Sequence, residues 1–169
     1  MPETINEYLW QKRYDIKVRA LTNRIYYQER GRLFEFREGF IKATSIVAGS
    51  VALARVAEPE IIQLCAAFIT FASTLSLVFG YGQKARDSIK FSAEWALLER
   101  EIDQAGERDF TEHQINTWFA RANEIEASEP SAHKRLLKRC HQRAVTALGG
   151  TMESSKSWLD LYCPVFLVP

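Results

Sequence analysis

The side chains that could catalyse a reaction or bind a metal are scattered along the chain. The three histidines are His113, His133 and His141. His133 and His141 lie eight residues apart on a predicted helix that also carries Cys140, so about two helical turns separate them, too far to share a metal without other ligands. Three carboxylates alternate along another predicted helix, at Glu99, Glu101 and Asp103. Carboxylates two residues apart point to different helix faces, so they make no acid–base pair.

The short motifs of well-known catalytic and phosphate-binding sites do not occur in this sequence. It contains no GxGxxG, GxxxxGKS/T, HExxH or GxSxG. The sequence therefore predicts neither an enzyme nor a bound metal or cofactor.

Polar side chains follow one side of an otherwise apolar stretch, residues 61–82. They are Gln63, Thr70, Ser73, Thr74 and Tyr81. In a membrane, such groups face protein or water, which makes them candidates to line a pore or an oligomer axis. In the alternative, the Ser and Thr hydroxyls bond to carbonyls of their own helix, and Gln63 lies at the outer headgroups.

A second set of side chains forms a basic segment without a single acidic residue. Its cations are Lys134, Arg135, Lys138, Arg139 and Arg143. They are candidates to bind a phosphate-bearing ligand or an anionic partner. A solvated helix face, or a contact with anionic lipid, would have the same composition.

Composition limits what kind of chain positions these residues. The 169 residues include 22 Lys and Arg against 21 Asp and Glu, and 47% are apolar. This suits one compact domain or a membrane segment with a small cytosolic body, and no specific nucleic-acid binding is expected at this near-zero net charge. Cys65, Cys140 and Cys163 are widely spaced and form no CxxC, so we expect a reducing, intracellular setting. The first 30 residues contain no apolar run, so no cleavable signal peptide is predicted.

Residues 61–82 are predicted to span a membrane. These 22 residues carry no charge, and as a helix they would extend about 33 Å, enough for a hydrocarbon core of about 30 Å. The central helix of a soluble bundle would also be apolar all round. In a chain of 169 residues, however, few other elements could bury it.

The preceding stretch, 39–57, is a weaker candidate because Lys42 and Arg55 lie near its ends. Long side chains can lift such charges to the headgroups, so this stretch can also span, and Pro59 would begin the next helix after a short turn. Small residues at helical spacing would allow another helix to approach closely, at Ser45, Ala48, Gly49 and Ala52. The fold predicted is all-α, a two-transmembrane helical hairpin with a cytosolic helical bundle.

Basic residues flank the hairpin. Eight Lys or Arg precede Gly39, and three closely follow Gly82, so the positive-inside rule places both termini in the cytoplasm. The expected organisation is an N-terminal cytosolic amphipathic helix (1–38), the hairpin (39–82), a cytosolic helical region (83–150) and a C-terminal tail (151–169).

The cytosolic helices carry their own patterns. A capping box at Thr4-x-x-Glu7 predicts the first helix start, and Thr111-x-x-Gln114 and Ser131 predict two later ones. Apolar residues with heptad spacing form a seam that includes Trp95, Leu98 and Ile102. This seam could pack on the N-terminal helix of the same chain or on another subunit.

Residues 35–148 resemble a known family. The similarity lies in YGQKARDSIK at 81–90 followed by Trp95-x-x-Leu98-x-x-Glu101-Ile102, and then in Arg121-x3-Ile125-Glu126-x2-Glu129-Pro130 and Leu136-Leu137-x2-Cys140. These segments are similar to SLATT proteins, two-transmembrane effectors of bacterial nucleotide-signalling and conflict systems.

The resemblance implies a homo-oligomer in the bacterial inner membrane. Its two-helix units would permeabilise the membrane when a cytosolic signalling partner or a nucleotide signal activates the oligomer, as in antiviral defence. Two alternatives remain from the sequence. One is a membrane-anchored scaffold that recruits a cytosolic partner, and the other is a soluble helical adaptor.

Overall fold

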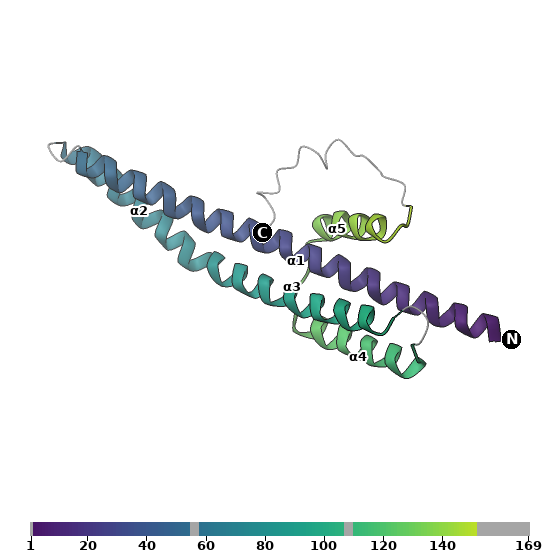
Figure 1. Ribbon diagram of the computed structural model, residues 1–169. Coiled ribbons are helices and arrows are strands. Elements are labelled where there is room, and N and C mark those ends of the chain that lie inside the picture. The colour runs from purple at the N-terminus through teal and green to yellow at the C-terminus, as the bar shows by residue number, and fades with distance from the viewer. Residues whose placement is uncertain (1, 55–57, 107–109, 152–169) are drawn as a thin grey trace. The chain divides into compact units, whose positions relative to one another are not determined.

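The structure, a computed structural model, describes residues 2–54, 58–106 and 110–151, and the side chains from residue 6 onward (Figure 1). The described residues form five helices and contain no strand, so the all-α prediction is confirmed. The helices are α1 (Pro2–Ala54), α2 (Pro59–Phe79), α3 (Tyr81–Gln104), α4 (Glu112–Ser128) and α5 (Lys134–Ala147). Arg55, Cys163 and nearly all of the predicted tail lie outside the described residues.

Helix α1 is a single helix of 53 residues. It joins the predicted amphipathic helix and the first predicted span, because its Gly31, Gly39 and Gly49 are tolerated inside a helix and no proline follows Pro2. It already includes Thr4, so the capping box predicted there does not mark its beginning.

The chain forms two compact units. Unit 1 comprises the described residues of Met1–Glu29 and Ser88–Pro169, and unit 2 is Arg30–Asp87. Unit 2 therefore extends beyond the predicted hairpin, 39–82, at both ends.

Unit 1 is a helical bundle around one apolar core. The core joins Ile16 and Tyr27 of α1 to residues of α3, α4 and α5, among them Ile115 and Cys140. Trp95, Leu98 and Ile102 of α3 are completely buried in this core. The heptad seam thus packs within its own chain, which removes it as a surface for another subunit.

Local caps fix where α4 and α5 begin. At α4, the Thr111 hydroxyl accepts from Gln114 N while the Gln114 side chain accepts from Thr111 N, which confirms the predicted capping box. Helix α5 begins at Lys134 rather than at Ser131. Its N-cap is His133, whose backbone N–H donates to the Tyr26 hydroxyl at 2.9 Å. A contact with α1 therefore decides this boundary.

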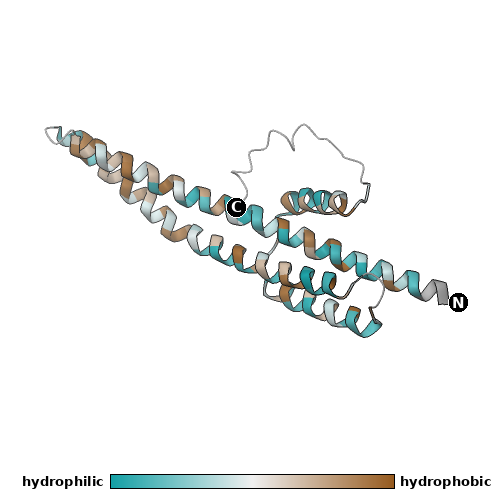
Figure 2. Ribbon diagram, viewed as in Figure 1, coloured by the Kyte–Doolittle hydropathy of each residue, from teal (hydrophilic) through white to brown (hydrophobic). Residues whose placement is uncertain are grey.

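Unit 2 contains two apolar helical segments side by side, the second half of α1 and α2 (Figures 1 and 2). The turn between them includes Glu58 in an extended conformation and Pro59 in the first turn of α2, as predicted. Helix α2 ends at Gly80, whose φ of 59° is left-handed. Helix α3 therefore begins separately, at Tyr81.

One helical stretch among the described residues is long and apolar enough to cross a membrane. It begins at Pro59, and its most apolar window has a mean hydropathy of 2.0 with 11% of its residues buried. The part of α1 predicted as the other span does not meet the same test.

Candidate functional site

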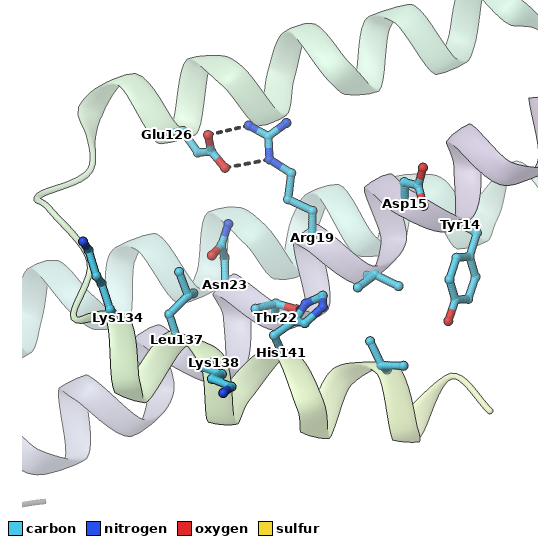
Figure 3. Close-up of a pocket in the computed structure, with 12 residues that line it drawn as sticks. Tyr14, Asp15, Arg19, Thr22, Asn23, Glu126, Lys134, Leu137, Lys138 and His141 are labelled. Atoms are coloured by element: carbon cyan, nitrogen blue, oxygen red, sulfur yellow. Dashed lines mark hydrogen bonds and ion pairs between the residues drawn. The ribbon is translucent and has the colours of Figure 1, made fainter. Parts of the chain in front are cut away.

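A cavity of about 750 Å³ lies between α1, α4 and α5 of unit 1 (Figure 3). Helix α1 contributes one wall with Tyr14, Val18 and Asn23, and α5 the opposite wall with Leu137 and His141. This volume falls within the range of small-molecule sites, about 300–1,000 Å³. The cavity is therefore large enough for an organic ligand.

An ion pair between α1 and α4 forms one edge of the cavity. Both nitrogens of the Arg19 fork face the Glu126 carboxylate, Nε at 2.6 Å from Oε1 and Nη2 at 2.5 Å from Oε2 (Figure 3). Arg19 Nη2 also donates to Asn123 Oδ1 at 3.0 Å. This bidentate arrangement fixes the Arg19 side chain and neutralises its charge.

The basic residues of α5 divide into two groups. Lys134 and Lys138 lie one turn apart and line the cavity (Figure 3), whereas Arg143 lies outside it and binds Glu29 of α1 at 2.8 Å. Arg135 and Arg139 are exposed and also lie outside the cavity lining. The five predicted anion-binding residues therefore do not form one site, and of the five only Lys134 and Lys138 line this cavity.

Two partly buried carboxylates lie elsewhere in unit 1. Glu129 accepts a hydrogen bond from Trp95 Nε1, yet desolvation by burial raises its pKa. Burial also raises the pKa of Glu99, although Arg24 pairs with it at 3.1 Å. These carboxylates sit among structural partners and do not line the cavity.

The thiol of Cys140 is buried in the core, and desolvation raises its pKa to about 11. A nucleophilic cysteine needs a depressed pKa, so Cys140 has the environment of a structural residue. Within the described ranges, no group of three or more His, Cys, Asp or Glu side chains could hold a metal ion.

In unit 2, the predicted pore-lining residues separate into two environments. Gln63, Thr70, Ser73 and Thr74 are exposed on α2. The Thr70 hydroxyl donates to Ala66 O and the Thr74 hydroxyl to Thr70 O, both at 2.8 Å. These hydroxyls thus make the bonds to their own helix that the alternative interpretation expects.

Tyr81 does not share that exposed face. It is half-buried at the start of α3 and stacks against Phe79 and Phe34, with ring centroids 5.6 and 6.2 Å away. The aromatic contacts, rather than an open channel, account for its position.

The four small residues of α1, namely Ser45, Ala48, Gly49 and Ala52, are half-buried on one side of the helix. Intervening apolar residues, such as Ile46 and Leu53, are 70% and 77% exposed. A Cβ added at Gly49 would have no atom within 4 Å. Gly49 thus leaves open space that no other part of the described chain fills.

Comparisons with family models, curated proteins and solved structures found no match.

Several cavity residues were not predicted from the sequence. Tyr14 and Val18 belong to the apolar stripe of the N-terminal helix, but periodicity does not say which helix that stripe meets. Thr22 and Asn23 are buried polar residues on α1, a signal that appears only once burial is known. Arg19 and Glu126 are 107 residues apart, and no local pattern connects them.

Proposed function

We propose that the chain is an oligomeric membrane effector of the SLATT type, which permeabilises a bacterial inner membrane. In this proposal the apolar part of unit 2 is a two-helix hairpin in the lipid, and unit 1 lies in the cytoplasm with both termini. The observation that carries the proposal is the exposure of the apolar helix α2, where Leu77 is 84% and Phe71 64% exposed. A helix this apolar needs lipid or another subunit around it, because large exposed apolar surfaces are rare in soluble monomers.

The length of α2 supports insertion. Its 21 residues would extend about 32 Å, close to the thickness of the hydrocarbon core. The apolar part of α1 is shorter, and Lys42 near its beginning binds Glu38 at 2.7 Å. Pairing reduces the cost of bringing this lysine near the headgroups, where its long side chain can reach water.

Aromatic and basic residues gather in unit 2 where a cytoplasmic interface is proposed. The Phe34 ring is buried, and the cations of Arg30, Arg37 and Lys84 lie 5.5, 5.9 and 5.8 Å from its centroid. Tyr81 stacks on the same ring. Aromatic rings beside cations are typical of headgroup depth on the cytoplasmic side.

Two experiments test membrane insertion: mapping the location of the two termini, and placing a charged residue in the middle of α2. Reporters fused at Met1 and after Pro169 should both report cytoplasm. Phe71→Asp should lower the membrane yield, since a central Asp costs about 2.5–3.5 kcal/mol, whereas Phe71→Leu should not. A fully soluble wild-type chain would contradict the proposal in favour of a soluble adaptor.

Assembly is tested at Gly49. Because the described chain leaves space around this position, Gly49→Leu should fold normally as a single chain but separate helices of neighbouring copies. The mass of the complex in detergent should fall, while Gly49→Ala should retain it. An unchanged mass would exclude this face as the contact between copies.

Permeabilisation is tested in liposomes loaded with a fluorescent ion indicator. Thr70→Val with Thr74→Val retains side-chain shape and should reduce flux by making the proposed constriction harder to wet. If wild-type protein inserts and assembles but leaks no ions under any activating condition, a membrane-anchored scaffold replaces the effector. Unchanged flux in the double variant would place the constriction elsewhere.

A further inference from the structure

The cavity of unit 1 contains positive charge that the described chain does not neutralise. Lys134 and Lys138 of α5 are exposed at its edge, and neither ammonium has an ion pair within the described residues. Arg19 is already neutralised by Glu126, and Asp15 accepts a hydrogen bond from Gln11 at 2.9 Å. An anion bound beside the two lysines would gain charge-assisted hydrogen bonds.

The floor of the cavity offers an unused hydrogen-bonding group. Asn23 of α1 is 9% exposed and lines the cavity, and its side-chain amide makes no hydrogen bond to the described residues. Beside it, the Thr22 hydroxyl lies 3.4 Å from His141 Nδ1, beyond the distance of a strong hydrogen bond. Because Asn23 lines the open cavity, a polar atom of a bound molecule could pair with its amide.

The remaining walls are apolar. They include the side chains of Val18, Leu137 and Val145. Tyr14 lies beyond His141 when viewed from Lys134 (Figure 3). An aromatic body would fill this space, while Asn23 would bind a polar atom on it. A plain acyl chain would displace water from the Asn23 amide without replacing its hydrogen bonds, which is costly.

We propose that this cavity is a binding site for a small dissolved organic anion, a carboxylate or phosphate attached to an aromatic body that carries a hydrogen-bonding group. The anion binds Lys134 and Lys138, the body lies against Leu137 and Val18, and its polar atom pairs with Asn23. The site belongs to unit 1 and does not require that unit 2 permeabilise a membrane. A binding assay and a flux assay can therefore fail separately.

The test uses the full chain in detergent and a matched pair of probes, indole-3-acetate and the neutral indole-3-acetamide. Ligand-observed NMR should show saturable binding of both, with the carboxylate bound about tenfold more tightly, as expected for one charge-assisted hydrogen bond. Lys134→Gln with Lys138→Gln should abolish this preference. Arg139→Gln, on the same helix but outside the cavity, should retain it.

Asn23 provides a second and independent variant. Asn23→Leu has nearly the same size and loses no hydrogen bond within the described chain, so the protein should remain folded while both probes bind several-fold more weakly. Absence of saturable binding to the wild type at millimolar concentrations would overturn the proposal. Equal affinity for the two probes would also overturn it.

Other occupants give distinct results. If dodecanoate displaces indole-3-acetate and binds more tightly, the site takes a lipid-derived acid and the proposed ligand class is wrong. If a chain ending at Thr151 binds the probe but the full chain does not, residues 152–169 occupy the cavity instead, which likewise overturns the proposal.

Discussion

The hydrogen bond between Trp95 and Glu129 gives a stability prediction whose magnitude follows from the structure. Trp95 is completely buried in the unit 1 core, and its Nε1 donates to the partly buried Glu129 carboxylate. Trp95→Phe keeps an aromatic ring but removes the donor. A hydrogen bond to a charged group contributes about 1.5–3 kcal/mol, and the smaller ring should add about 1–2 kcal/mol, since full truncation of Trp costs about 3–5 kcal/mol.

The expected loss for Trp95→Phe is therefore about 3 kcal/mol, or a little over a hundredfold in the unfolding equilibrium. Amide hydrogen exchange at core residues of unit 1, measured on the full chain in detergent, reports this change directly.

Trp118→Phe is the matched control, because Trp118 is also buried and no hydrogen bond from its indole to the described residues is present. For Trp118→Phe we expect only the loss of packing, which should accelerate hydrogen exchange about tenfold. If both variants accelerate exchange equally, the bond to Glu129 contributes nothing to stability. A Glu129→Gln background provides the double-mutant cycle that isolates the pair.

Three further predictions concern single residues. Burial raises the pKa of Glu129 above its usual 4.5, so the contribution of Glu129 to stability is largest below pH 4.5 and is lost as pH rises through the raised value. Glu129→Gln should reduce this loss of stability with rising pH, as measured by amide hydrogen exchange at a series of pH values. Gly80→Ala should cost about 1 kcal/mol because φ is left-handed there and no neighbour obstructs the new methyl group, so exchange should accelerate around residue 80, and less so in Gly80→Asn. With a pKa of about 11 and only 1% of its surface exposed, Cys140 should resist iodoacetamide at neutral pH until unit 1 unfolds, as followed by mass spectrometry of its peptide.

Sequence patterns predicted those features of the fold that depend on nearby residues. The capping box at Thr111 marks the beginning of α4, and the apolar composition after Pro59 identifies α2 as the membrane candidate. Gly149, just after the end of α5, has a left-handed φ, which a glycine adopts readily. In each case the deciding interaction spans only a few residues.

Features that depend on distant contacts could not be predicted in this way. The beginning of α5 depends on the Tyr26 hydroxyl, 107 residues away in the sequence. The heptad seam around Trp95 had two possible partners, because a helical pattern specifies an apolar face but not the surface that covers it. Likewise, the basic composition of α5 did not reveal which of its five Lys and Arg residues line the cavity, namely Lys134 and Lys138.

The hydrogen bonds of Thr70 and Thr74 have a consequence for ion selectivity. Each hydroxyl donates its proton to a carbonyl of its own helix, so what remains on the exposed side is an oxygen with free lone pairs. Where several copies of α2 turn this face toward a shared aqueous path, Thr70 and Thr74 would solvate cations as water oxygens do and would themselves offer no donor to an anion. Such a path should conduct potassium in preference to chloride, and a reversal potential set by chloride would rule out this face as its lining.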